Sequence, residues 1–350
     1  MKFKRLKAPF GWLGGKSQLA NDIVKLMPEH KMYVEVFGGG LNVLYAKEKI
    51  RLEVVNDING ELINLHRHIR KSPKSLSFYL KQFLISRELF YDMKFKRFKP
   101  RNDIERAAVY YYLISQSFGC KCDNFAMSTK SFRKPNDIYK SFHKWSNRLK
   151  HTTIENMSFE KLIKTYDKEG AFFYCDPPYY KTEKYYKNIG EFGEREHRLL
   201  ADVLRGSKGK WLVSYNDCEF IRELYRGFNI LESKEIEYLL GKNVHGKRKV
   251  VRVIVIINEN KVFIDTDSVL SANCSIEHNP STGDRELMLR IIHKYGGFTL
   301  LEVSNKEEGN QIVESISNEK NKTSIAIEKK QYELFKDGCE YALNLLPKVE

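Results

Sequence analysis

The chain has 350 residues, of which 42% are hydrophobic, so it can bury the core of one large domain or of two smaller ones. No apolar run approaches the ~20 residues of a membrane-spanning helix, and the basic N-terminus is not followed by the apolar segment of a signal peptide. The six cysteines are scattered, and the Cys120-x-Cys122 spacing is not that of a zinc site. The simplest expectation is a reduced, cytoplasmic protein that holds no metal and does not enter a membrane.

The net charge of +15 is unevenly distributed along the chain. Residues 261–350 hold 11 Lys and Arg against 15 Asp and Glu, a net −4, which leaves 49 basic and 30 acidic residues, a net +19, for the first 260. A basic domain of this size suggests a polyanionic partner, most often nucleic acid. A generally lysine-rich proteome would give the same composition, so charge alone does not decide between the two.

The first patterned segment, residues 9–28, contains a glycine pair followed by a helical pattern. Its Gly15-Lys16-Ser17 is similar to the end of a phosphate-binding P-loop. That motif also requires a glycine five residues before its Gly-Lys pair, and that position is Phe10. The segment therefore does not predict a nucleoside triphosphatase.

Residues 33–37 form a short β-type run, glycines occupy positions 38–40, and residues 41–48 have a helical pattern. A strand, a glycine turn and a helix are typical of the first unit of a cofactor-binding α/β sheet. A second apolar strand at 52–55 ends in Asn56-Asp57. An acid at this strand tip is well placed to hold ribose hydroxyls, but Asp57 also precedes a predicted helix and could cap it.

Residues 60–150 interrupt this alternation of strands and helices. Helical patterns cover residues 73–99 and 103–118 and recur near 138–149, and a basic loop or hairpin at 119–137 lies between the last two. Aromatic residues mixed with Lys and Arg are typical of nucleic-acid-binding surfaces. A solvated helical insertion is the alternative interpretation.

The alternation resumes after residue 150. We expect strands at 152–156, 171–175, 210–217 and 247–258, with helices at 194–204 and 218–228. This order predicts an α/β fold built on a doubly wound, mostly parallel sheet whose last strands are antiparallel.

The strand at 171–175 ends at Asp176 because Pro177 and Pro178 cannot donate hydrogen bonds to a neighbouring strand. Ligands of open α/β sheets bind at the carboxyl ends of strands. Asp176 and the carbonyl beside Pro177 could accept both hydrogens of an exocyclic amine, and Tyr179 offers a ring for stacking. The arrangement suits methyl transfer to a nucleobase amine, for which Cys175, inside the strand, is not needed.

The sequence resembles the Dam-type family of DNA adenine-N6 methyltransferases. The resemblance covers roughly residues 8–257 and is carried by an ordered set of motifs. They are Pro-Phe-Gly-Trp-Leu-Gly-Gly-Lys at 9–16, Val-Glu-Val-Phe-Gly-Gly-Gly at 34–40, Asn-Asp-Ile-Asn at 56–59, Asp-Pro-Pro-Tyr at 176–179 and Ser-Tyr-Asn-Asp-Cys-Glu-Phe-Ile-Arg-Glu-Leu-Tyr at 214–225.

The resemblance implies a Rossmann-like methyltransferase sheet, S-adenosyl-L-methionine as cofactor and an adenine flipped out of double-stranded DNA as substrate. The catalytic residues that it implies are Asp176, Pro177, Pro178 and Tyr179. The cofactor-binding residues that it implies are Trp12, Lys16, Glu35, Phe37, Gly38, Gly40, Asp57, Phe159 and Asp176. Restriction–modification is one setting in which such enzymes act.

The DNA-binding hairpin departs from the family pattern. Members that methylate GATC carry Leu-Asn-Arg-Thr-Cys-Phe-Asn-Gly before this hairpin, whereas residues 113–134 here lack the Arg-Thr-Cys run, and their first arginine is Arg133. We expect lysines of this loop to contact phosphates and an arginine to contact base edges, without predicting GATC as the target. The DNA-contacting residues expected are Lys121, Phe125, Lys130, Arg133, Lys134 and Lys181.

These patterns predict three parts. Residues 1–59 and 151–257 form the catalytic domain, residues 60–150 are an inserted helical target-recognition domain, and residues 258–350 are a small acidic α/β appendage. In the appendage we expect helices at 281–297, 306–316 and 329–346 and strands at 298–303 and 323–328. The acidic charge argues against DNA contact and favours a stabilising role or contact with another protein. The oligomeric state is left open, with a monomer as one option.

Two other functions remain open at this stage. One is methylation of a different planar amine, such as an RNA base, cytosine N4 or a protein amide, because the same turn serves several of them. The other is a catalytically silent DNA-binding remnant, against which the intact Glu35, Gly38, Asp57 and Asp176 argue.

Overall fold

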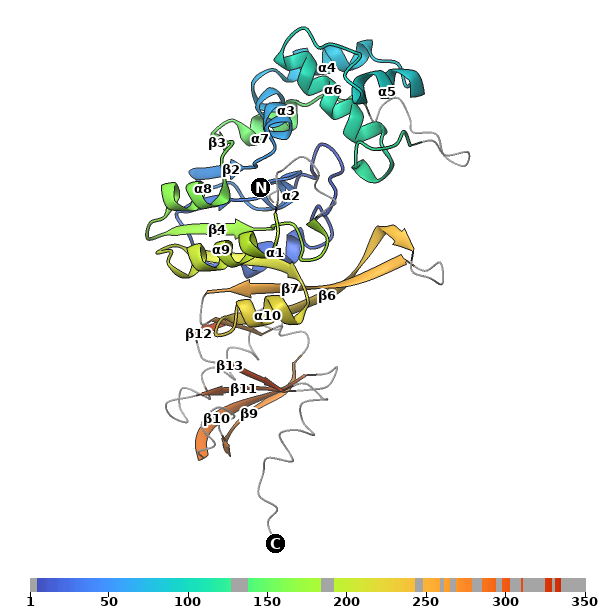
Figure 1. Ribbon diagram of the computed structural model, residues 1–350. Helices are drawn as coiled ribbons and strands as arrows, with labels where there is room; N and C mark the ends of the chain where they lie inside the picture. Colours follow the sequence, from blue (N-terminus) through green and yellow to red (C-terminus); the bar gives the residue numbers. More distant parts are fainter. Residues whose placement is uncertain are drawn as a thin grey trace. The chain divides into compact units, whose positions relative to one another are not determined.

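The computed structural model describes residues 5–126, 138–183, 192–242, 248–258, 261–264, 269–278, 285–293, 298–302, 310, 325–328 and 331–334. The chain divides into two compact units, Met1–Asn258 and Glu259–Glu350. Figure 1 shows the helices and strands of both units along the chain.

A seven-stranded sheet with the order β3-β2-β1-β4-β5-β7-β6 organises the first unit. Its strands are β1 (Met32–Glu35), β2 (Leu52–Asn56), β3 (Thr152–Glu155), β4 (Ala171–Cys175), β5 (Lys210–Asn216), β6 (Asn229–Lys242) and β7 (Arg248–Ile257). The first five strands of this order pair in parallel, and β7 pairs antiparallel with β5 and with β6. The predicted doubly wound, mostly parallel sheet is confirmed, although β6 was not predicted.

The strands form where the sequence is continuously apolar. Every residue of β1 and β4 is buried, as is expected of parallel strands covered on both faces. The chain leaves β1 for β2 in one direction and β4 for β5 in the other, so right-handed crossovers place α2 (Asn42–Ala46) and α9 (Glu194–Arg205) on opposite faces. Helix α1 (Ala20–Leu26) packs on α2, α8 (Phe159–Tyr166) packs on α9, and α10 (Glu219–Leu224) follows β5.

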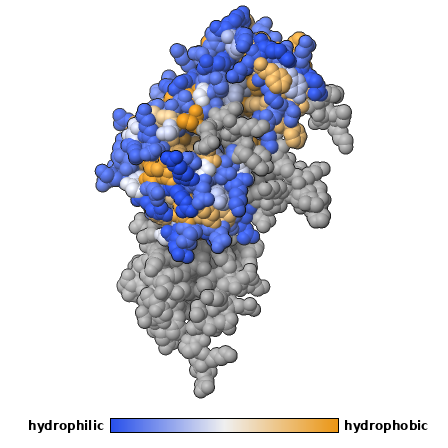
Figure 2. Space-filling model, in the orientation of Figure 1, coloured by the Kyte–Doolittle hydropathy of each residue, from blue (hydrophilic) through white to orange (hydrophobic). Residues whose placement is uncertain are grey.

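The insertion between β2 and β3 is helical, as predicted. It contains α3 (Gly60–Lys71), α4 (Pro73–Gln82), α5 (Arg87–Lys94), α6 (Asp103–Gln116), the 3₁₀ turn η1 (Phe118–Cys120) and α7 (His143–Leu149). The helix expected over 73–99 is divided, because Ser86 caps α5 by accepting a hydrogen bond from the Leu89 N–H. Hydrophilic residues cover most of the described surface of the insertion in Figure 2.

A buried ion cluster joins the insertion to the sheet. Glu53 on β2 is 3% exposed, and its carboxylate accepts hydrogen bonds from Arg148 at 2.5 and 2.9 Å and from Lys47 at 2.7 Å. Burial alone would raise the pKa of Glu53, but Arg148 and Lys47 outweigh it and hold the pKa below its usual range. Because Arg148 lies on α7, this cluster fixes the returning end of the insertion to β2.

The second unit differs from its prediction. The helix expected over 281–297 is wrong, because Arg285–His293 is strand β10, paired antiparallel with β9 (Val269–His278) and β11 (Phe298–Glu302). The helix expected over 329–346 is wrong where it is described, at β13 (Gln331–Leu334). The strands expected at 298–303 and 323–328 are confirmed as β11 and β12 (Ile325–Glu328), and β12 pairs with β8 (Lys261–Ile264). The helix expected at 306–316 lies almost entirely outside the described residues.

Candidate active site at the carboxyl ends of the strands

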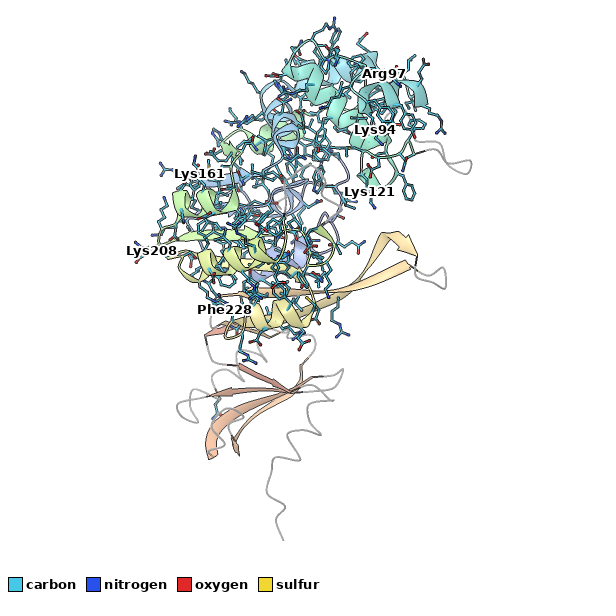
Figure 3. The ribbon with its side chains drawn as sticks, viewed as in Figure 1. Lys94, Arg97, Lys121, Lys161, Lys208 and Phe228 are labelled. Carbon is cyan, nitrogen blue, oxygen red and sulfur yellow. The ribbon has the colours of Figure 1, made fainter. Side chains whose placement is uncertain are left out.

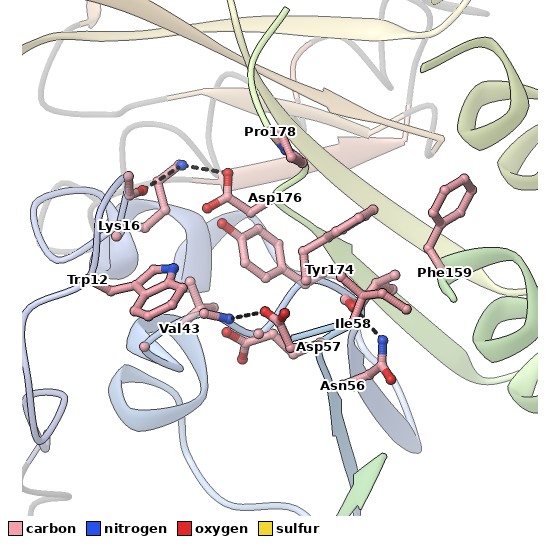
Figure 4. A pocket seen from close by; sticks show the side chains of 18 of the residues that line it. Trp12, Lys16, Val43, Asn56, Asp57, Ile58, Phe159, Tyr174, Asp176 and Pro178 are labelled. Carbon is pink, nitrogen blue, oxygen red and sulfur yellow. Dashed lines mark hydrogen bonds and ion pairs between the residues drawn. The ribbon is translucent and has the colours of Figure 1, made fainter. Parts of the chain in front are cut away.

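A cavity of about 280 Å³ opens where β1 and β4 lie side by side and their outgoing connections diverge. Residues after β1, β2, β3 and β4 line it, together with residues 12–16 of the N-terminal segment. This is the position at which doubly wound sheets bind ligands. Figure 4 shows the side chains that face it.

The glycine turn after β1 brings backbone close to the cavity. The Gly38 N–H donates to the Asn56 carbonyl at 2.7 Å, and a Cβ at Gly38 would lie 2.8 Å from that oxygen. Gly39 has φ +49°, and a Cβ there would lie 2.7 Å from the Trp12 ring. The Trp12 indole therefore packs directly on the turn, and no side chain fits at either glycine without displacement.

Asp57 ties the tip of β2 to this turn. Its carboxylate accepts hydrogen bonds from the Gly39 N–H and the Asn59 N–H, both at 2.9 Å. Asn59, not Asp57, caps α3, because the Asn59 side chain accepts from the N–H groups of Glu61 and Leu62. Burial raises the pKa of Asp57, and the two backbone hydrogen bonds oppose that rise.

A second acid, Glu35 at the end of β1, lies deeper in the cavity wall and is 2% exposed. Its Oε2 accepts hydrogen bonds from the Tyr33 hydroxyl at 2.8 Å and from the Leu44 N–H at 3.0 Å. Burial raises the pKa of Glu35 to about 8, although both hydrogen bonds favour the carboxylate. A cationic group in the cavity would favour the carboxylate further.

Asp176 at the end of β4 has two partners. The Lys16 ammonium lies 2.5 Å from Asp176 Oδ1, and the Ser214 hydroxyl donates to the same oxygen at 3.0 Å. Burial raises the pKa of Asp176, whereas the charge of Lys16 and both hydrogen bonds lower it. Lys16 also lies 4.6 Å from the centre of the Tyr179 ring. The lysine thus joins the N-terminal segment to the turn after β4.

One wall of the cavity is aromatic. The rings of Phe37, Phe159 and Phe192 meet with centroid distances of 5.7, 5.9 and 6.0 Å. Phe37 follows β1, Phe159 is the first residue of α8, and Phe192 precedes α9. The wall offers a flat ligand an apolar surface in the same cavity as the acids.

The structure brings the predicted cofactor residues together around one cavity. All of the residues predicted for this role line it, namely Trp12, Lys16, Glu35, Phe37, Gly38, Gly40, Asp57, Phe159 and Asp176. Pro178 also lines it, whereas Pro177 and Tyr179 do not, and Tyr179 is 8% exposed. The sequence interpretation gave no site role to five further lining residues, namely Asn42, Asn56, Tyr174, Phe192 and Glu196, although Asn56 belongs to the motif at 56–59 and Tyr174 to the strand before Asp176.

A second cleft, of about 640 Å³, lies between residues 12–13 and the α5–α6 region. We call it the basic cleft because five of its lining residues are cationic, namely Lys94, Lys96, Lys99, Arg106 and Lys121. Arg106 pairs with Glu61 and Asp103, but Lys96 and Lys99 have no ion pair with another described residue. Lys94, Arg97 and Lys121 follow one side of the molecule in Figure 3, and Lys161 and Lys208 follow the other. Trp12 and Leu13 line both cavities.

The predicted DNA-contacting residues separate into three groups. Lys121 lines the basic cleft. Phe125 packs on Phe90 at 5.6 Å and lies 5.5 Å from the Arg87 guanidinium, and Lys181 is exposed beside Tyr180. Lys130, Arg133 and Lys134 lie outside the described residues. Lys96 and Lys99 also line the basic cleft, although the sequence interpretation did not select them.

Two further properties concern the described part of the chain. Its helices include none with the length and apolar character needed to cross a bilayer. Among the same residues, His, Cys, Asp and Glu nowhere gather in threes as a metal site would require.

Comparison with known proteins adds to this geometry. The model of the D12 class N6 adenine-specific DNA methyltransferase family matches residues 12–239. The type II methyltransferase M.CviBI of Paramecium bursaria Chlorella virus NC1A is 28% identical over 230 residues, 62% of this chain and 85% of the relative. The DNA adenine methylase of Haemophilus influenzae is 26% identical over 283 residues, 75% of this chain and 97% of the relative. The type II methyltransferase M1.LlaDCHI of Lactococcus lactis is 29% identical over 266 residues, 70% of this chain and 93% of the relative.

The contact between Gly39 and Trp12 gives a direct test of the cavity geometry. Gly39→Ala should lower the free energy of unfolding by at least about 1–2 kcal/mol, the cost of a left-handed backbone at a residue with a Cβ, because the new methyl must also displace the indole. Gly206→Ala is the matched control, since a Cβ there would meet its nearest atom at an ordinary 3.7 Å. Urea denaturation measures both, and equal stabilities would contradict the geometry.

Proposed function

The chain belongs to the family of D12 class N6 adenine-specific DNA methyltransferases, and we propose that the cavity at the strand ends is where S-adenosylmethionine and the target adenine meet. The family match and the relatives named DNA adenine methylases support methyl transfer to adenine N6 in DNA. They set aside RNA bases, cytosine N4 and protein amides as the acceptor. The observation that carries the proposal is the placement of Asp176, Lys16, the glycine turn and Asp57 around one cavity.

The residues present fit S-adenosylmethionine. The glycine turn presents backbone without side chains to the cavity, and Asp57 offers carboxylate oxygens that can accept hydrogen bonds from ribose hydroxyls. The aromatic wall suits a stacked adenine ring, and Glu35 suits the ammonium of the methionine part. When bound, the cofactor supplies an electrophilic methyl group.

The turn after β4 would hold the acceptor amine. Asp176 and the Pro177 carbonyl are hydrogen-bond acceptors, and the two prolines restrict the backbone between them. If each acceptor takes one hydrogen of N6, the nitrogen lone pair is withdrawn from the ring and becomes available for attack on the methyl group. Lys16 and Ser214 orient the Asp176 carboxylate for this role.

The target adenine can stack on the Tyr179 ring only where Lys16 does not cover it. The Lys16 ammonium occupies one face of the ring at 4.6 Å, and the ring is nearly buried. An adenine that stacks on this face must displace Lys16. We therefore expect Lys16 to leave the Tyr179 ring when the target base enters and to keep its ion pair with Asp176.

The basic cleft would bind the DNA backbone. The N6 amine of a paired adenine lies inside the duplex, so the base must leave the stack to reach the cavity. A cleft that shares Trp12 and Leu13 with the cavity, and in which Lys96 and Lys99 have no ion pair among the described residues, can hold phosphates next to the point of entry. The disposition of residues 60–150 supports their proposed role as the target-recognition domain.

The experiment that tests the proposed function removes the acceptor carboxylate. Asp176→Ala, saturated with cofactor and DNA, should slow transfer of a labelled methyl group to duplex DNA by about 10²–10³, as loss of one preorganised hydrogen-bonding group does, in protein that still folds. Asp202→Ala is the matched control, because Asp202 is exposed and pairs only locally with Arg205. Near-normal transfer by Asp176→Ala with cofactor bound would refute the catalytic assignment.

A second experiment tests the basic cleft. The double variant Lys96→Ala, Lys99→Ala should weaken binding to all DNA sequences alike and reduce the slope of log K against log salt by about 2, since each phosphate contact contributes about 0.9. The double variant Lys161→Ala, Lys208→Ala removes the same charge elsewhere on the surface. Titrations at several salt concentrations measure both slopes. An equal change in the two variants would show that net charge, not the cleft, sets the affinity.

A further inference from the structure

A buried histidine connects three elements behind the proposed amine site. His197 on α9 is 0% exposed. Its Nε2 lies 3.1 Å from Glu183 Oε1, just downstream of the turn after β4, and its Nδ1 lies 2.8 Å from the Tyr215 hydroxyl on β5. A fully buried imidazole that uses both nitrogens is held in one orientation.

The hydrogen-bond partners of His197 determine which of its ring nitrogens carries the hydrogen. An ionised carboxylate only accepts hydrogen bonds, so Nε2 carries the hydrogen and donates it to Glu183. The unprotonated Nδ1 then accepts from the Tyr215 hydroxyl. Burial lowers the pKa of His197, and Glu183 only partly opposes this, which agrees with the neutral imidazole.

The His197 imidazole also packs against aromatic residues beside the site. Tyr180, next to Tyr179, packs edge-on against the imidazole at 5.7 Å and stacks on Phe220 at 4.3 Å. Phe192 of the aromatic wall packs edge-on against the imidazole at 4.9 Å. On the other side Tyr215 follows Ser214, the residue that donates to Asp176.

Glu183 joins this arrangement to the backbone of the loop. Its carboxylate accepts a hydrogen bond from the Lys181 N–H at 2.9 Å, with Lys181 in a left-handed conformation at φ +65°. The Thr182 N–H and hydroxyl both lie 2.9 Å from the Tyr179 carbonyl. Residues 179–183 therefore form one hydrogen-bonded turn, and the bond between Glu183 and His197 attaches its far end to α9.

We propose that His197 is a positioning residue for methyl transfer, which holds the turn of residues 179–183 through Glu183 and so fixes the orientation of the amine acceptors. The proposal rests on the function proposed above. His197 does not touch the reacting atoms and acts through Glu183 and Tyr180. If His197 only filled the core, it would make the same contacts, but the rate of methyl transfer would not depend on which of its two ring nitrogens keeps a hydrogen-bond partner.

Two substitutions at one position separate these roles. In His197→Gln the amide nitrogen reaches the place of Nε2 and can still donate to Glu183, whereas in His197→Asn the amide reaches only the place of Nδ1. We expect His197→Gln to keep the single-turnover transfer rate within about threefold of wild type. We expect His197→Asn to lower the rate by about tenfold or more, the effect of losing one hydrogen bond to a charged group.

Glu183→Ala removes the same bond from the loop side. It should match His197→Asn, and the double variant should be no slower than either, because the two changes remove one shared interaction. Saturating S-adenosylmethionine and duplex DNA isolate the rate of the bound complex, and calorimetry should show unchanged cofactor affinity. His30→Gln is the control, since His30 packs on Phe172 at 5.0 Å and lines neither the cavity nor the basic cleft.

The outcomes distinguish the two proposals. Equal losses in His197→Gln and His197→Asn, additive losses in the double variant, or a normal rate in Glu183→Ala would each overturn the positioning role. Wild-type protein that transfers no methyl group to adenine would instead overturn the proposed function itself. Thermal unfolding of every variant shows whether a slower rate reflects a lost fold.

Discussion

The ion pair between Lys16 and Asp176 is the contact on which the site depends. It joins the N-terminal segment to the end of β4, 160 residues later, at a distance of 2.5 Å. Burial makes an isolated carboxylate unfavourable at this position, and the lysine offsets that cost. The same segment brings Trp12 onto the glycine turn, so that one stretch of chain closes the cavity and borders the basic cleft. The proposed cofactor site, the proposed amine site and the basic cleft thus share one segment of the chain.

A second buried carboxylate gives the arrangement its rigidity. The Glu53 carboxylate binds Arg148 and Lys47. Removal of one partner from a buried ion pair lowers the free energy of unfolding by about 3–5 kcal/mol. Arg148 belongs to the helical insertion, whereas Lys47 and Glu53 belong to the first β-α-β unit. The cluster therefore keeps the insertion in a fixed position relative to β2, from whose end Asp57 reaches the glycine turn. The geometry of the basic cleft next to the cavity follows from this attachment.

Much of the site was predictable because its signals are local. The apolar run at 171–175 followed by two prolines defines the end of β4, and the glycines at 38–40 mark the turn after β1. Contacts set by tertiary packing were not predictable, such as Phe192 in the cavity wall and His197 between β5 and the loop. The error at Arg285–His293 has a similar cause. Its leucines and isoleucines suit either a helix face or one face of a strand, and pairing with β9 decides for the strand.

In the proposed mechanism an ionised Asp176, kept so by Lys16, accepts the target amine. The most direct measurement is the pH dependence of single-turnover methyl transfer by the wild type, Lys16→Met and Lys16→Arg. Lys16→Met removes the charge that lowers the Asp176 pKa, so the pKa should rise and the acidic limb of the profile should move to higher pH. Lys16→Arg keeps the charge and should leave the limb near its wild-type position. An unchanged limb in Lys16→Met, with only a uniform loss of rate, would contradict the account.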